Sequence, residues 1–146
     1  MAENRSGATE TVDRLLESKL DSVDEAESLV IQMAEKAGFD EDDLHKIAMS
    51  VRESMVNAVV HGNRYNAHKK VHVKVSNGPG RLEIKIADQG EGFELTDIPD
   101  PLDEENLLRN SGRGIFLMKA FMDEVQVRRG EPAGTEVTMI KYLVSK

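Results

Sequence analysis

Glu53, Asn57 and His61 follow one another at steps of four residues, along a segment that is otherwise almost wholly apolar. On an α-helix this spacing places the three side chains on one face. A carboxylate can accept the proton of an attacking hydroxyl, and an amide oxygen is a hard ligand that suits Mg²⁺. The pair Glu53 and Asn57 therefore predicts proton transfer beside a metal, with the polar stripe of an amphipathic helix as the structural alternative.

The histidines add little to this chemistry. His61 is expected to cap the end of its helix or to pack against its neighbours rather than to act in catalysis. His45, His68 and His72 have no metal-ligand spacing, and the chain has no His-Glu-x-x-His motif. We therefore expect no metal-binding role for these three histidines.

A glycine-rich turn, Asp88-Gln89-Gly90-Glu91-Gly92, follows directly after a strand-like run. The carboxylate of Asp88 could accept a hydrogen bond from an exocyclic amine, as a buried Asp would do with adenine. Glycines at 90 and 92 allow positive φ and the close approach of a flat ligand. A plain Asp-Gly turn is the alternative. An EF-hand loop is excluded because glycines occupy positions that need oxygen ligands.

A second glycine turn, Ser111-Gly112-Arg113-Gly114, comes directly before a helix-like run. The free N–H groups at the start of that helix could hold phosphate. The turn lacks the third glycine of a dinucleotide fingerprint and the Lys-Ser/Thr of a Walker loop. Taken alone it indicates either a phosphate contact or a structural helix entry.

The first half of the chain is predicted to be helical. Residues 10–20 fit either a helix or an opening strand. Ser22 and Glu25 have the form of a capping box, which predicts a helix that ends at Gly38. A second helix is expected to begin at Asp40 and to end near Gly62-Asn63.

The second half changes to an alternating pattern. Residues 71–76 and 82–86 predict an antiparallel hairpin, and residues 93–110 predict a loop. A helix over 115–122 and strands over 124–129 and 135–144 complete the expected elements.

The composition describes a globular protein of 146 residues, with 39% apolar and 32% charged residues. We expect residues 1–9 to be a disordered leader and residues 10–146 to form one domain. The net charge of −8 argues against direct nucleic-acid or anionic-membrane binding. No apolar run approaches a membrane span, and the absence of cysteine and of a secretory signal favours a cytoplasmic location.

The order of these motifs resembles a known family. Glu-x-x-x-Asn on a helix, Asp-x-Gly-x-Gly after a hairpin strand, Gly-x-Gly before a helix and Gly134-Thr135 opening a last strand resemble the four boxes of the GHKL (Bergerat-fold) ATPases. The strings ESMVNAVVHGN, DQGEGF, GRGIFLMKAFMDEV and GTEVTM look most like the anti-sigma factor serine kinases. The resemblance covers roughly residues 10–144.

The resemblance implies a role for each matching residue. Glu53 would be the general base, Asn57 would ligate Mg²⁺, and Asp88 would bind the adenine amine. Further nucleotide contacts would come from the two glycine turns and the last strand, at Gly90, Gly92, Ser111, Gly112, Arg113, Gly114 and Thr135.

One position departs from the family pattern. Related kinases often have an arginine immediately before the Ser-Gly-x-Gly turn, and here that residue is Asn110. Arg109 and Arg113 flank it, and either could neutralise the γ-phosphate as a catalytic cation.

The resemblance also implies the fold and the activity. The expected fold is α+β, a two-layer sandwich with a mixed, mainly antiparallel sheet and helices on one face. The implied protein binds ATP or ADP with Mg²⁺, sequesters a sigma factor and phosphorylates a serine on an anti-anti-sigma (STAS-type) protein, with a homodimer left open. A regulatory module that binds nucleotide without catalysis is the alternative, and a fragment of a sensor histidine kinase or gyrase-like ATPase is a third interpretation.

Overall fold

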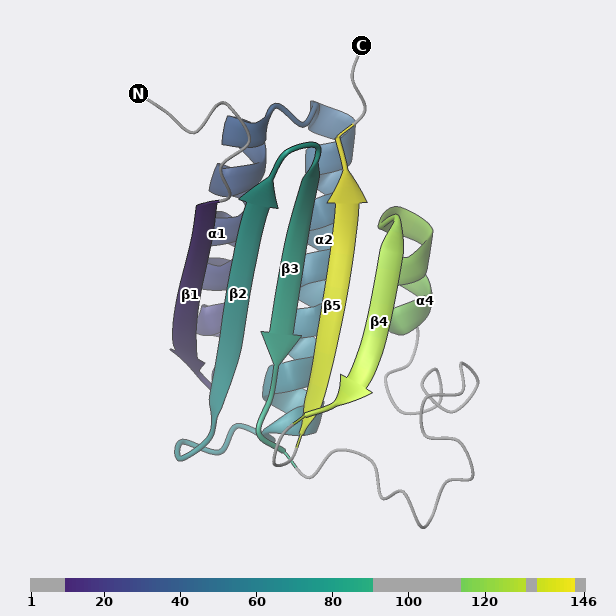
Figure 1. The fold of residues 1–146 in the computed structure, drawn as a ribbon. Helices are drawn as coiled ribbons and strands as arrows, with labels where there is room; N and C mark the ends of the chain where they lie inside the picture. The colour runs from purple at the N-terminus through teal and green to yellow at the C-terminus, as the bar shows by residue number, and fades with distance from the viewer. Residues whose placement is uncertain (1–9, 91–113, 131–133, 144–146) are drawn as a thin grey trace.

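A five-stranded antiparallel sheet has its helices on one face (Figure 1). The computed structural model describes residues 10–90, 114–130 and 134–143. The elements in chain order are β1 (Glu10–Glu17), α1 (Asp21–Ala37), α2 (Glu41–Val56), the π-helix η2 (Asn57–Gly62), β2 (Lys70–Gly78), β3 (Arg81–Ala87), α4 (Gly114–Phe121), β4 (Glu124–Arg129) and β5 (Thr135–Tyr142).

The strand order is β1-β2-β3-β5-β4, and each neighbouring pair is antiparallel. The expected α+β sandwich with a mainly antiparallel sheet is therefore confirmed, and no parallel pair occurs among the described strands. Figure 1 shows α1, α2 and α4 behind the sheet, so that the other face is left uncovered by described elements.

The predicted hairpin follows from strict alternation along β2 and β3. Val73 and Val75 of β2 pair with Ile86 and Ile84 of β3, and all four side chains are buried toward the helices. The intervening residues, such as Lys74, lie on the open face. The hairpin is thus confirmed, and its buried valines and isoleucines form the centre of the core.

The ambiguous segment near the N-terminus is a strand. β1 pairs with β2 along its whole length, with Leu16 opposite Val71. Leu16 is buried, whereas Leu15 points to the open face and is 68% exposed. The helical alternative for this segment is therefore wrong, because the strand pairing along β2 turns only alternate residues toward the core.

The start of α1 differs from the predicted capping box. The helix begins at Asp21, two residues earlier than a capping box at Ser22 predicts, and its N-cap residue Leu20 makes no side-chain capping bond. Ser22 is buried, and its N–H donates to the carbonyl of Lys19 at 3.0 Å. A backbone turn thus satisfies the donor that the capping box was expected to satisfy. The predicted end at Gly38 is confirmed by its left-handed φ of 103°.

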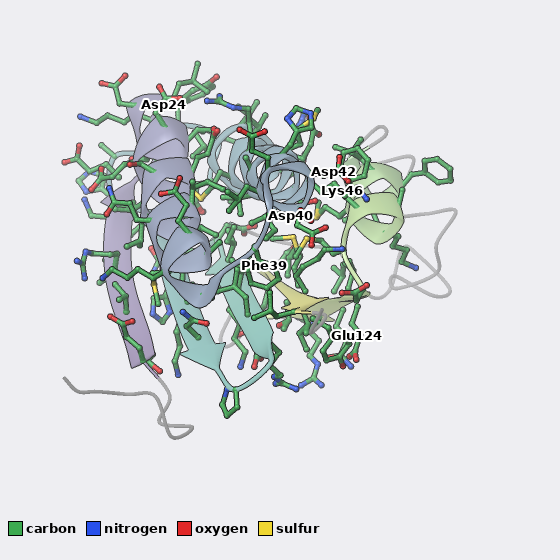
Figure 2. All side chains as sticks on the ribbon, turned by 90° about the horizontal axis from the view of Figure 1, so that it is seen from above. Asp24, Phe39, Asp40, Asp42, Lys46 and Glu124 are labelled. Carbon is green, nitrogen blue, oxygen red and sulfur yellow. The ribbon has the colours of Figure 1, made fainter. Side chains whose placement is uncertain are left out.

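The α2 helix begins as predicted. Asp40 is the N-cap, and its Oδ1 accepts a hydrogen bond from the Asp43 N–H at 2.9 Å. Figure 2 shows this end of α2 with Asp40 and Asp42 labelled, next to the buried Phe39. Further along, Arg52 bonds to Asp24 and Glu27 of α1 and so links the two helices at the surface.

The helix 115–122 and the last two strands are also confirmed, as α4, β4 and β5. Ile115 and Met118 of α4 are buried, which fixes this short helix in the helical layer. Among the described residues, no helix is long and apolar enough to cross a membrane.

Candidate functional site

Asp88 lies directly after β3 and is only 8% exposed. Its Oδ1 accepts hydrogen bonds from the N–H groups of Gly90, at 3.0 Å, and of Thr135, at 3.2 Å. Its own N–H donates to the carbonyl of Thr135 at 3.0 Å. These bonds fix the carboxyl group at the ends of β3 and β5, and the described residues leave Oδ2 free to accept from a ligand.

Burial raises the pKa of the Asp88 carboxyl above its ordinary value. The hydrogen bonds from Gly90 and Thr135, and the charge of Lys69, act in the opposite direction without cancelling the effect of burial. A carboxyl group that is removed from water and keeps one acceptor oxygen unused can accept a hydrogen bond from the amine of a ligand.

Three glycines allow close packing around Asp88, because a Cβ atom on any of them would clash with a neighbour. A Cβ atom on Gly62 would lie 2.4 Å from the Asp88 Cγ and Oδ2. On Gly134 it would lie 2.0 Å from the Asp88 carbonyl oxygen, and on Gly90 it would lie 2.0 Å from the Gly62 carbonyl oxygen. The end of η2, the turn after β3 and the start of β5 therefore approach one another closely around Asp88.

This contact makes Gly62→Ala a direct test of the site. The added methyl group must displace the Asp88 carboxyl, and we expect ATP affinity to fall by roughly 10-fold or more, the scale of a 1–3 kcal/mol overpacking. Calorimetric titration with ATP measures the effect. The substitution should also lower the free energy of unfolding in the wild type but change it little in an Asp88→Ala background, since the clashing group is gone. An equal loss of unfolding free energy in both backgrounds would contradict the contact between Gly62 and Asp88.

Glu53 and Asn57 lie on one face of the α2–η2 segment, as predicted, and both are partly exposed. The first residue of α4, Gly114, packs against them. A Cβ atom on Gly114 would lie 2.8 Å from Asn57 Nδ2 and 3.1 Å from Glu53 Oε1. The N-terminus of α4 thus lies beside a carboxylate and an amide, and a helix N-terminus favours a bound anion.

The π-helix changes the register after Asn57. The N–H of Asn63 donates to the carbonyl of Ala58, five residues earlier, at 2.8 Å. The regular four-residue spacing therefore ends at Asn57, and His61 is exposed. His61 lies in the last turn of this π-helix, one residue before Gly62.

The described part of the site thus contains Glu53, Asn57, Asp88, Gly90, Gly114 and Thr135. The other predicted site residues, Gly92, Arg109, Ser111, Gly112 and Arg113, lie outside the described residues, as do Asn110 and the predicted loop 93–110. Their roles stay predictions. Within the described ranges, no group of three His, Asp or Glu side chains is placed to hold a metal.

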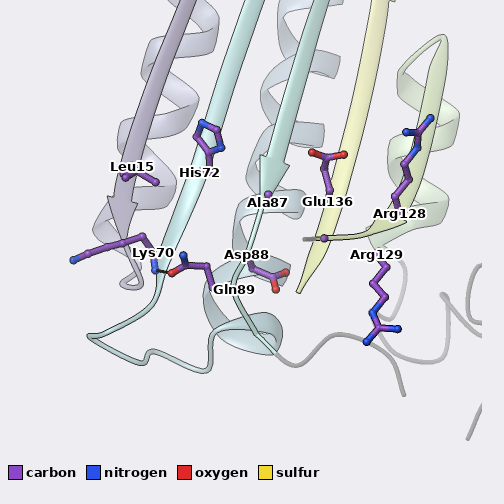
Figure 3. A pocket seen from close by; sticks show the side chains of 10 residues that line it. Leu15, Lys70, His72, Ala87, Asp88, Gln89, Arg128, Arg129 and Glu136 are labelled. Carbon is purple, nitrogen blue, oxygen red and sulfur yellow. Dashed lines mark hydrogen bonds between the residues drawn. The ribbon is translucent and has the colours of Figure 1, made fainter. Parts of the chain in front are cut away.

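A pocket opens next to Asp88 on the uncovered face of the sheet (Figure 3). Residues that are in register across the five strands line it, namely Leu15, His72, Ala87, Glu136 and Arg128. Neither Glu53 nor Asn57 lines this pocket. Asp88 does line it, so the pocket borders the Asp88 end of the site, whereas Gly114 meets Glu53 and Asn57 on the helical side.

Sequence reasoning missed two features of the site. Gly62 was expected only as the end of a helix, yet it contacts the Asp88 carboxyl. Asn63, also expected only near the helix end, is 2% exposed and bonds to the residue that follows Asp88. The only sequence signal for the role of Asn63 was a polar residue directly after the glycine that ends a helix, and this signal is weak.

Comparison with known proteins supports the motif assignment. A family model described as a histidine kinase-like ATPase domain matches residues 16–141. The serine-protein kinase RsbW of Bacillus licheniformis is 33% identical over 117 residues, which cover 76% of this chain and 72% of the relative. The anti-sigma F factor of Bacillus thuringiensis (strain Al Hakam) is 36% identical over 104 residues, which cover 70% and 71%.

A solved structure supports the fold. The crystal structure of the RsbU and RsbW domains of a Mycobacterium tuberculosis protein superposes with a TM-score of 0.69 at 16% identity. The match covers 94% of this chain and 33% of that longer chain.

Proposed function

Because the chain belongs to the histidine kinase-like ATPase family, and within it to the anti-sigma factor serine kinases, we propose that it phosphorylates a serine on an anti-anti-sigma (STAS-type) protein and sequesters a sigma factor. ATP would be the phosphate donor and ADP the product. The proposed location is the cytoplasm, without direct contact to nucleic acid or membrane.

The observation that best supports this proposal is the arrangement along η2. Asn57 begins this helix beside Glu53 and Gly114, and Gly62 ends it against the Asp88 carboxyl. Roughly 7 Å along the helix axis thus separates Asn57, beside Glu53, from Gly62, beside the Asp88 carboxyl. That order suits a nucleotide with its base at Asp88 and its phosphates toward α4.

Each residue then has a stated task. The free Oδ2 of Asp88 would accept a hydrogen bond from the adenine amine, with Thr135 and Gly90 holding the other oxygen. Glu53 would orient and deprotonate the attacking serine hydroxyl. The Asn57 amide would be the protein ligand of Mg²⁺, which neutralises phosphate charge when it is bound. Arg109 or Arg113 would contact the γ-phosphate.

Transfer of radiolabelled phosphate tests the proposal. The purified chain, incubated with labelled ATP, Mg²⁺ and candidate partner proteins, is expected to label a serine on one of them. Copurification of a sigma factor with and without ATP tests the second half of the proposal.

The presence of Asn110 in place of an expected arginine favours a second candidate, a regulatory module that binds ATP or ADP without catalysis. Such a module would bind nucleotide and change its partner affinity while no partner became labelled. Failure to bind ATP at all would contradict both candidates.

A further inference from the structure

Asn63 occupies a buried position at the point where η2 ends, and each polar atom of its side chain is used. Its Nδ2 donates to Ser18 Oγ at 2.9 Å and to the Lys70 carbonyl at 3.0 Å. Its Oδ1 accepts from the Gln89 N–H at 2.7 Å. The orientation of the amide is determined by these partners, because a backbone N–H can only donate and a carbonyl can only accept.

The network extends from Asn63 into three other segments. Ser18 Oγ also donates to the Lys69 carbonyl, and the Lys70 N–H donates to Gln89 Oε1. The turn before α1, the end of η2, the start of β2 and the turn after β3 are therefore bonded together. Ser18 and Asn63 at the centre of the network are buried, and moving either of them would break the hydrogen bond that joins them.

One bond of this network joins the two segments that form the proposed adenine pocket. Among the described residues, the bond from Gln89 N–H to Asn63 Oδ1 is the hydrogen bond that links the end of η2 to the Asp88–Gly90 turn. Gly62 and Asp88, the immediate neighbours of the two bonded residues, are the pair whose contact allows no side chain on Gly62. The bond therefore lies directly beside the place where these two backbones approach most closely.

The chain leaves Asn63 through a strained backbone. Arg64 and Tyr65 both have positive φ, at 52° and 59°, which is unfavourable for side chains with a Cβ atom. The Tyr65 N–H returns to the carbonyl of Val59 at 3.0 Å, beyond the end of the regular helix. Strain of this kind persists only where the surroundings hold it, and the Asn63 network lies directly at its start.

We infer that Asn63 is a positioning residue for adenine recognition: through Gln89 it sets the place of the Asp88 carboxyl without touching the nucleotide. The inference rests on the proposed function, in which Asp88 accepts from the adenine amine. A carboxylate held in place accepts from the amine of adenine and repels the carbonyl oxygen of guanine. Loss of the hydrogen bond between the Gln89 N–H and Asn63 should therefore have two effects. It should weaken ATP binding, and it should reduce the preference for ATP over GTP.

The test compares Asn63→Ala with Ser18→Ala, a member of the same network that has no bond to Gln89. Titration with ATP and with GTP, both with Mg²⁺, gives the two dissociation constants. We expect Asn63→Ala to weaken ATP binding about tenfold, the effect of losing one buried hydrogen bond, and to lower the ATP-to-GTP preference. Ser18→Ala should lower the thermal midpoint but change both dissociation constants less than about twofold.

Asn63→Asp separates positioning from stability. Its carboxylate still accepts from the Gln89 N–H but cannot donate to the Lys70 carbonyl, so it should fold less stably than wild type and yet bind ATP more tightly than Asn63→Ala. An unchanged ATP affinity in Asn63→Ala, or equal losses in Asn63→Ala and Ser18→Ala, would overturn the inference. Wild-type protein that does not distinguish ATP from GTP would instead show that the proposed adenine site is wrong.

Discussion

Phosphate transfer is expected to fall by roughly 10²–10⁴-fold in Glu53→Gln, while ATP affinity stays close to that of the wild type. The amide keeps the size of the side chain, so its packing beside Gly114 is preserved. It cannot take a proton from the serine hydroxyl, and transfer would then depend on positioning and charge neutralisation alone. Single-turnover transfer from labelled ATP to the partner measures the change.

Glu41→Gln is the matched control for this experiment. Glu41 is exposed in the first turn of α2, at the opposite end of this helix from Glu53. It should transfer phosphate at the wild-type rate. If Glu53→Gln also did so, Glu53 would not be the base; if it failed to bind ATP, its part in the site would be structural.

The fold was predictable from the sequence wherever one periodicity dominated. Val73 and Val75 alternate with polar residues, and the stripe through Ile47 and Val51 recurs every four, so the hairpin and α2 were predicted with the right type. The segment 10–20 was ambiguous because Leu15 and Leu16 are adjacent, and only pairing with β2 decides which leucine is buried. A strand at a sheet edge depends on such non-local contacts.

The candidate site was predictable only as far as motif spacing extends. Glu53, Asn57 and Asp88 stand in a recognisable order, and the structure brings Gly114 to the first two. The contact between Gly62 and Asp88 joins residues from different elements, and a π turn cannot be read from a helical pattern. Such features arise from tertiary packing, so the π turn and the contacts of Asn63 could not be predicted from the helical pattern alone.

Replacing Asp88 by Asn is expected to stabilise the nucleotide-free protein at neutral pH while weakening ATP binding by roughly 30- to 100-fold. The amide oxygen can still accept from the N–H groups of Gly90 and Thr135. Its nitrogen, however, replaces the oxygen that would accept from the adenine amine, so donor would face donor. The same nitrogen could donate to the carbonyl oxygen of guanine, and relative affinity for GTP should therefore rise.

The sign of the stability change follows from the raised pKa of Asp88. A carboxyl whose pKa is higher in the folded than in the unfolded state contributes stability below the unfolded pKa and loses that contribution as pH rises through the folded pKa. At neutral pH the ionised carboxylate is buried at a cost that the amide avoids. The advantage of Asp88→Asn should therefore shrink as the solution is acidified through the folded pKa.

Thermal unfolding of the wild type and of Asp88→Asn, at neutral and at acid pH and with and without ATP, tests both halves of this prediction. Asp42→Asn, at an exposed position paired with Lys46 at 3.4 Å, is the control and should change neither stability nor ATP binding appreciably. A lower midpoint for Asp88→Asn at neutral pH would mean that the carboxylate stabilises the fold. Undiminished stabilisation by ATP would mean that the adenine is bound elsewhere. If the buried Asp88 carboxyl serves nucleotide recognition rather than folding, Asp88→Asn should be more stable than the wild type and yet be stabilised much less by ATP.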